Sequence, residues 1–255
     1  MIGKVFLVGA GPGAPDLLTL RAAEILQRAD VVLHDALVDS RTLALAARAR
    51  RIPVGKRSGR VSTAQKFINK RLVDAARTHR VVVRLKGGDP MLFGRAQEEI
   101  DALRSAGIDV EIVPGVTAAS AAASEIGVSL TRRGLARHVA LVTPRAADGE
   151  RGNDWAASVL AADTAVIYMG ARLAEMISAE LMKRGKSPRT PVAIVESASL
   201  PGRRVFLGKL ADLPRLAAQT GDGPAVVLVG EVLKEAARER GAVSASSVEP
   251  LLRQA

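Results

Sequence analysis

Predicted strands and helices alternate along the first half of this chain, and this alternation constrains the fold more than any other feature. Apolar strand patterns occupy residues 4–9, 31–35, 80–87 and 110–115, and amphipathic helix patterns occupy residues 20–29, 61–78 and 94–107. Thr19 is the expected N-cap of the first of these helices. Strands joined by helical crossovers form a mostly parallel sheet, so we predict an α/β fold for this half.

The second half has strand patterns at less regular spacing, over residues 137–144, 164–170, 190–197, 203–210 and 224–232. The connector 198–204 is short enough to make two of these strands hairpin neighbours, which predicts a mixed sheet. We place a domain boundary near residue 120. The expected organisation is an N-terminal α/β domain over 1–118, a C-terminal α/β domain over 119–240, and a disordered tail over 241–255.

The formal net charge of +11, from 37 basic and 26 acidic residues, favours a polyanionic partner. Nucleic acid, an anionic membrane and a small polycarboxylate all fit, and a general bias toward basic residues explains the charge equally well. Aromatic residues make up only 2% of the chain, which argues against single-stranded nucleic acid. With no apolar run near ~18 residues, no signal-peptide layout and no cysteine, we expect a cytoplasmic protein.

The first strand runs into a glycine-rich turn that satisfies the loose dinucleotide fingerprint through Gly9, Gly11 and Ala14. A dinucleotide turn needs a helix that begins at the second glycine, but Pro15 follows and the helix pattern starts only at Thr19. This disfavours a nicotinamide or flavin site. Similar strand-and-glycine turns recur in both halves, and they point to one ligand cleft shared by the two domains.

Nine motifs occur in order along residues 3–236, and together they resemble the tetrapyrrole methylase family. They are VGAGPGAPDLLTLRA (8–22), HDALV (34–38), VGKR (54–57), VRLKGGDPMLFGR (83–95), VPGVTAASA (113–121), VSLTRR (128–133), YMG (168–170), PVAIVESAS (191–199) and PAVVLVGEV (224–232). VGKR and KGGDP narrow the resemblance to members that methylate uroporphyrinogen III. Each motif is weak alone, and the order and spacing make the set specific.

The resemblance implies an S-adenosyl-L-methionine-dependent C-methyltransferase that converts uroporphyrinogen III to precorrin-2 by two methylations, and releases S-adenosyl-L-homocysteine. The product serves cobalamin or sirohaem biosynthesis. The family fold is two α/β domains with the cofactor in the cleft between them, usually as a homodimer. We expect no metal, because His34, His79 and His138 lack ligand spacing, and we expect no nucleic-acid or membrane partner.

Two residues are the catalytic candidates by resemblance. Asp35, at a strand end, matches the family's proton acceptor, although a helix cap or turn residue is the alternative. Lys56 matches the proton donor, although a lysine near a polycarboxylate can serve only as a counter-charge.

The binding candidates also carry over by motif. The residues expected to contact the cofactor are Pro12, Gly87, Gly88, Asp89, Leu92, Thr117, Ala118, Met169, Ala198 and Ala225. Forked guanidinium groups pair well with carboxylates, so the candidate substrate clamps are Arg57, Arg95, Arg132 and Arg133. Ordinary turns, core packing and solvated surface charge are the alternatives for these positions.

The sequence departs from the family pattern at several points. Ser197-Ala198-Ser199 stands where Asn-Gly-Thr is common, so φ of Ala198 must be negative. His34 replaces a common Tyr. Rival functions are a methylase for a later precorrin or ribosomal RNA, a flavin or nicotinamide oxidoreductase, and a non-enzymatic nucleic-acid binder.

Overall fold

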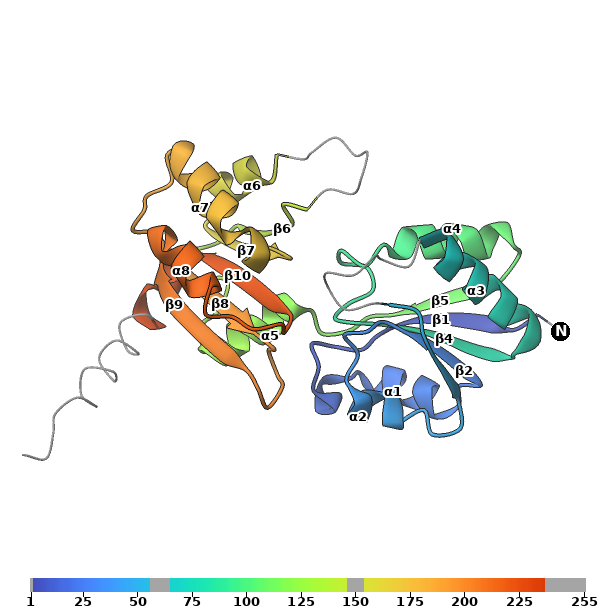
Figure 1. Ribbon diagram of the computed structural model, residues 1–255. Coiled ribbons are helices and arrows are strands. Elements are labelled where there is room, and N and C mark those ends of the chain that lie inside the picture. The colour runs from blue at the N-terminus through green and yellow to red at the C-terminus, as the bar shows by residue number, and fades with distance from the viewer. Residues whose placement is uncertain (1, 56–64, 146–153, 237–255) are drawn as a thin grey trace, which may run out of the picture. The chain divides into compact units, whose positions relative to one another are not determined.

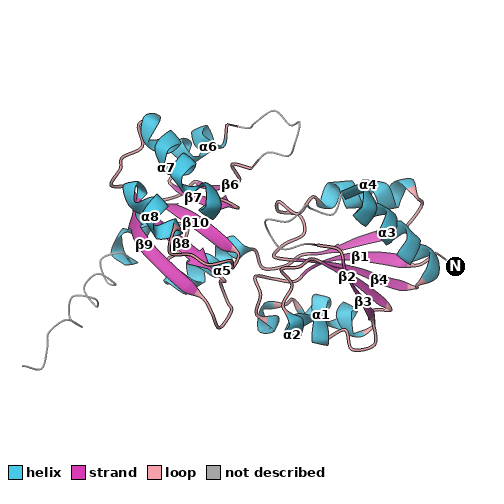
Figure 2. Ribbon diagram, in the orientation of Figure 1, coloured by secondary structure: helices cyan, strands magenta, loops and turns pink. Residues whose placement is uncertain are grey.

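The computed structural model describes residues 2–55, 65–145 and 154–236. The chain divides into two compact units, Met1–Ala121 and Ala122–Ala255, and the division falls inside helix α5 (Ala118–Ile126). In each unit, helices pack on a five-stranded sheet (Figures 1 and 2). The segment 241–255, for which we expected a disordered tail, lies outside the described residues.

The sheet of the first unit is parallel throughout and has the strand order β3-β2-β4-β1-β5. Its strands are β1 (Lys4–Gly9), β2 (Val31–His34), β3 (Arg50–Pro53), β4 (Val81–Lys86) and β5 (Val110–Val113). The predicted parallel sheet is confirmed. The sequence patterns did not predict β3, because its residues include two exposed arginines and show no apolar alternation.

Four helices cover the two faces of this sheet. Helices α1 (Leu20–Gln27) and α2 (Ser40–Ala44) lie on one face, and α3 (Gln65–Thr78) and α4 (Ala96–Ser105) on the other (Figure 1). Alternate residues of each strand feed the two cores: Val5 and Leu7 pack with α3 and α4, whereas Phe6 and Val8 pack with α1. The result is a three-layer α/β/α unit.

The sheet of the second unit is mixed, as predicted, with the order β6-β7-β10-β8-β9. Its strands are β6 (Val139–Val142), β7 (Thr164–Tyr168), β8 (Pro191–Glu196), β9 (Arg204–Lys209) and β10 (Ala225–Gly230). Only the β6–β7 pair is parallel, and β8 and β9 form the expected antiparallel hairpin. Helices α6 (Trp155–Ala161), α7 (Ala174–Lys183) and α8 (Leu213–Ala217) pack on one face through a common apolar cluster.

Short 3-10 turns connect several of these elements, at Pro15–Leu17, Ala171–Leu173, Leu210–Asp212 and Glu231–Leu233. Over the ranges that the structure describes, no helix combines the length and apolar character that a membrane crossing requires. The parallel sheet of the first unit has the clearest consequence for function. All its strands end at one edge, so the segments that follow them are brought together there.

Candidate functional site

Three glycine turns meet at the carboxyl edge of the first sheet. Gly11, after β1, and Gly88, after β4, form an isolated bridge, with N–O distances of 3.2 Å and 2.7 Å between their backbones. Both have positive φ, +69° and +67°. A Cβ on Gly115, after β5, would lie 2.4 Å from the carbonyl oxygen of Gly88. The three turns therefore pack backbone against backbone: a side chain at Gly115 would prevent this approach, and Gly11 and Gly88 supply the positive φ values.

Asp89 ties two of these turns together. Its Oδ1 accepts a hydrogen bond from the backbone N–H of Met91 at 2.8 Å, and its Oδ2 accepts one from the N–H of Gly115 at 2.9 Å. Of the other cofactor candidates in this unit, Gly87 is exposed, and the partly buried ones are Pro12, Gly88, Leu92, Thr117 and Ala118. All of them follow β1, β4 or β5, so the edge gathers six expected contacts besides Asp89 from three separate motifs.

The first helix begins too late to serve a dinucleotide. A 3-10 turn that starts at Pro15 follows the glycine turn, and α1 begins only at Leu20. Thr19 is its N-cap, as predicted, and the Thr19 hydroxyl accepts from the N–H of Ala22 at 3.2 Å. The N-terminus of α1 therefore does not start at the glycine turn, and the dinucleotide interpretation fails on its own geometry.

Asp35 lies at the same edge, immediately after β2, and is paired with a buried arginine. Its Oδ1 accepts from Nη2 of Arg84 at 2.5 Å, and the side chain of Asp35 is 29% exposed. Arg84 also donates from Nε to Glu99 at 2.9 Å, and Glu99 receives Nζ of Lys86 on both oxygens at 3.1 Å. The four groups form a buried network of two positive and two negative charges.

The network follows from the periodicities of the two elements that supply it. Arg84 and Lys86 alternate on β4, so both side chains point to the face that α3 and α4 cover. Glu99 lies on the buried face of α4, together with Ala96 and Leu103. The Arg84, Lys86 and Glu99 side chains are at most 5% exposed, so each charge depends on the others for its solvation.

This environment shifts the pKa values of the two basic groups in opposite directions. Burial lowers the pKa of Arg84, but the carboxylates of Asp35 and Glu99 outweigh it and leave the pKa above its usual value. Burial and the neighbouring Arg84 lower the pKa of Lys86, against the opposing effect of Glu99. Arg84 is therefore a permanent cation at neutral pH.

Sequence reasoning missed Arg84, Lys86 and Glu99. The signal was available, since two cations alternate within an otherwise apolar strand, and one carboxylate falls on the apolar stripe of the following helix. A buried strand carries charge only where a partner neutralises it, so the pattern indicates a charge network rather than a solvated surface.

The candidate clamps differ in their surroundings. Arg95 pairs with Glu98 through two hydrogen bonds, at 2.7 Å and 2.9 Å, and Arg132 pairs with Glu235 at 2.9 Å. Arg133 is exposed, and no acidic side chain of the described ranges pairs with it. Lys56 and Arg57 lie outside the described residues. Arg95 belongs to the first unit, and Arg132 and Arg133 belong to the second.

The remaining cofactor candidates lie in the second unit. Met169, after β7, is 43% exposed and has φ of +56°, an unusual conformation for a residue with a side chain. Ala198, after β8, is buried, and Ala225 at the start of β10 is partly buried and pairs with Glu196. Ser197 and Ser199, on either side of Ala198, have positive φ, whereas Ala198 does not, as expected.

Glu125 of α5 fixes the turn around Ala198. Its Oε1 accepts from the backbone N–H of Ser199 at 2.9 Å, and its Oε2 pairs with Arg203 at 2.5 Å. A carboxylate that accepts from both a strained turn and a guanidinium holds that turn in one conformation. No sequence pattern indicates this contact.

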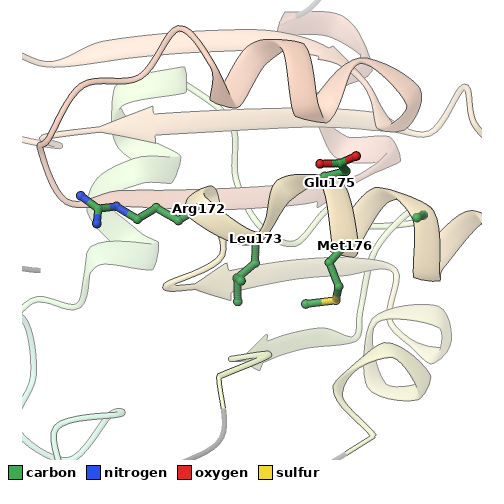
Figure 3. Close-up of a pocket in the computed structure, with 5 residues that line it drawn as sticks. Arg172, Leu173, Glu175 and Met176 are labelled. Carbon is green, nitrogen blue, oxygen red and sulfur yellow. The ribbon is translucent and has the colours of Figure 1, made fainter. Parts of the chain in front are cut away.

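A shallow hollow of about 320 Å³ lies elsewhere on the second unit, beside α7. Figure 3 shows the apolar side chains of Leu173 and Met176 on one side of the helix, away from Glu175. None of the predicted site residues lines this hollow. Within the described part of the chain, no three potential metal ligands of the His, Cys, Asp or Glu type gather in one place.

Comparison with known proteins agrees with this arrangement. The family model for tetrapyrrole (corrin/porphyrin) methylases matches residues 4–214. Together with the two α/β units and the glycine turns, this match defines the class: the chain belongs to the tetrapyrrole methylase family.

Individual relatives narrow the comparison. The uroporphyrin-III C-methyl transferase of Thermus thermophilus, solved in complex with S-adenosyl homocysteine, is 42% identical, with a TM-score of 0.80 over 91% of this chain and 100% of that one. The cobalt precorrin-4 methyltransferase is 29% identical, with a TM-score of 0.79, over 90% of this chain and 95% of that one. The siroheme synthase of Pseudomonas fluorescens Pf0-1 is 47% identical over 91% of this chain, but this chain spans only 50% of its length.

The buried network yields a prediction for stability. Replacing Glu99 with Gln leaves two buried cations with Asp35 as their one remaining carboxylate, so Glu99→Gln should destabilise the fold by about 3–5 kcal/mol. The matched control is Glu98→Gln on the exposed face of the same helix, where the loss should stay below about 1 kcal/mol. Urea unfolding of both variants measures the difference, and equal free energies of unfolding would contradict the network's assigned role.

Proposed function

We propose that the chain is an S-adenosyl-L-methionine-dependent C-methyltransferase that converts uroporphyrinogen III to precorrin-2 by two successive methylations, in cobalamin or sirohaem biosynthesis. The observation that carries this proposal is the 42% identity to a uroporphyrin-III C-methyl transferase over that protein's whole length. The siroheme synthase relatives support a place in sirohaem biosynthesis.

The glycine edge of the first sheet suits the donor. A Cβ on Gly87 would meet only Leu37, at 3.8 Å, and a Cβ on Gly88 would meet nothing within 4 Å, so the backbone there is open to a ligand. Exposed backbone amides and carbonyls can bind the amino-acid and ribose parts of the donor. When bound, S-adenosyl-L-methionine supplies an electrophilic methyl group on a sulfonium. We assign its contacts to Pro12, Gly87, Gly88, Asp89, Leu92, Thr117, Ala118, Met169, Ala198 and Ala225.

The substrate would be attracted by charge. Uroporphyrinogen III carries many carboxylates, and the chain's net charge of +11 favours encounter with such an anion. Arg57, Arg95, Arg132 and Arg133 are the proposed carboxylate clamps. For Arg95 and Arg132, binding would exchange the present partners, Glu98 and Glu235, for substrate carboxylates.

Asp35 is the proposed proton acceptor. The methylated tetrapyrrole must lose a proton, and a carboxylate that is 29% exposed at a strand end can receive it. Lys56 is the proposed proton donor by resemblance. No metal is assigned to any step, and each proton transfer uses a side chain of this protein.

An assay with uroporphyrinogen III and isotopically labelled S-adenosyl-L-methionine tests the proposed reaction. Mass analysis should show products carrying one and then two labelled methyl groups. Asp35→Asn should reduce turnover by roughly 10²–10⁴-fold, because it removes the proton acceptor while keeping the shape. Lys56→Ala should also slow turnover.

Calorimetry with S-adenosylhomocysteine serves as the control for these variants, since Asp35→Asn should keep its affinity for this product. A lost affinity would reassign Asp35 to cofactor binding, and full turnover by Lys56→Ala would remove its role as donor. An unlabelled tetrapyrrole after long incubation of the unmodified protein would refute the proposed reaction.

The open space at Gly87 gives a prediction for donor binding. Gly87→Ala should leave thermal stability within about 0.5 kcal/mol, because the new methyl group meets only ordinary contact. It should nevertheless weaken S-adenosylhomocysteine binding about tenfold or more, because it occupies the space of a closely packed ligand. Gly202→Ala, where a Cβ would meet nothing within 4 Å, is the control and should bind normally. Unchanged affinity in Gly87→Ala would place the donor elsewhere.

We also propose that the enzyme acts as a cytoplasmic homodimer with domains over 1–118 and 119–240. The family resemblance supports this assembly. Light scattering on the purified chain should give twice the mass of 26.7 kDa. A mass of one chain at micromolar concentration would contradict the dimer and leave the proposed reaction unaffected.

A further inference from the structure

Arg84 has a fixed position beneath the carboxylate of Asp35. The Arg84 side chain is 2% exposed, and all three nitrogens of its guanidinium are engaged: Nε with Glu99, Nη2 with Asp35, and Nη1 with the carbonyl of Leu85 at 3.2 Å. A guanidinium held in this way cannot swing out to bind a substrate carboxylate. Its role is therefore different from that of the proposed clamps.

Asp35 is held at both its backbone and one side-chain oxygen. Its N–H donates to the carbonyl of Leu85 at 3.1 Å, and its Oδ1 accepts from Arg84. Within the described ranges no group donates to Oδ2, and the side chain is 29% exposed. The pairing thus leaves one oxygen bound within the protein and the other available.

We infer that Arg84 is a positioning residue for catalysis: by holding Oδ1 of Asp35, it presents Oδ2 as the oxygen that takes the substrate proton. Glu99 in turn fixes Arg84, and Lys86 balances the charge of Glu99. This inference rests on the proposed methyl transfer. It adds a role for a residue that contacts neither the donor nor the tetrapyrrole.

The proton balance of the step is complete with these groups. A ring carbon forms a bond to the methyl carbon of the donor, and the methyl–sulfur bond breaks with its electron pair moving to sulfur. A C–H bond of the tetrapyrrole then breaks, its electron pair returns to the ring system, and the proton goes to Oδ2 of Asp35. Arg84 stays protonated throughout the step. Its role is to hold the carboxylate of Asp35 in one orientation.

The test compares Arg84→Met with Arg77→Met, a control at an exposed arginine on the last turn of α3. Met is close in volume, and the Lys86–Glu99 pair stays neutral in Arg84→Met. We expect kcat for uroporphyrinogen III to fall by roughly 10–100-fold, because a misplaced base slows transfer. The KM for S-adenosyl-L-methionine should change little, and the melting temperature should fall less than in Glu99→Gln, because Glu99 keeps Lys86 and Asp35 is partly exposed. Arg77→Met should keep the kcat of the unmodified enzyme.

Two further variants separate positioning from a purely structural role. Arg84→Lys should recover part of kcat, since it keeps the charge without the fork. Millimolar guanidinium should partly restore kcat to Arg84→Ala, whose shortened side chain leaves space for it, but not to Asp35→Asn. Parallel losses of kcat, donor affinity and melting temperature, or kcat within twofold of the unmodified enzyme, would overturn the inference. Inactive unmodified enzyme would instead refute the proposed reaction.

Discussion

The parallel register of the first sheet is the constraint on which the rest of the structure depends. Because β1, β2, β4 and β5 all end at one edge, four sequence motifs separated by many residues become neighbours there. The edge is compact because Gly115 lets its turn approach the backbone of Gly88 and because Gly11 and Gly88 adopt positive φ in the turns that they bridge. The outcome is a surface of main chain beside two carboxylates, Asp35 and Asp89. That combination suits a ligand bound by backbone groups next to a proton acceptor.

The charge network beneath this edge costs free energy of desolvation, and packing alone does not explain why the network is there. Desolvating Arg84, Lys86 and Glu99 is unfavourable, and an apolar core of similar volume is often as stable or more so. The same network ends at Asp35, which is the proposed proton acceptor. Core stability gives no reason for a buried guanidinium to reach the sheet edge, whereas the positioning of Asp35 does. The network thus lowers the stability of the fold but holds the carboxylate of Asp35 in place.

Much of the architecture could be predicted from sequence, because apolar periodicity and glycine turns report directly on parallel strands and crossover helices. The Thr19 cap, the β8–β9 hairpin and the negative φ of Ala198 were all deduced from local chemistry. The interactions between segments that are far apart in the sequence could not be deduced in this way. Charges within an apolar strand and on an apolar helix stripe indicate the contact between Arg84 and Glu99, but the contact between Glu125 and Ser199 carries no local signal. Roles for Asp35 and Lys56 came from family resemblance rather than from residue chemistry.

The central claim is that the carboxyl edge of the first sheet holds the methyl donor beside Asp35. Amide hydrogen exchange, with and without S-adenosylhomocysteine, tests it most directly, because it reports where the ligand protects the backbone. With the ligand bound, we expect slower exchange at the N–H groups of Gly87, Gly88 and residues 115–118, and little change along helix α7. Protection confined to α7 and its hollow, with none at the glycine turns, would contradict it.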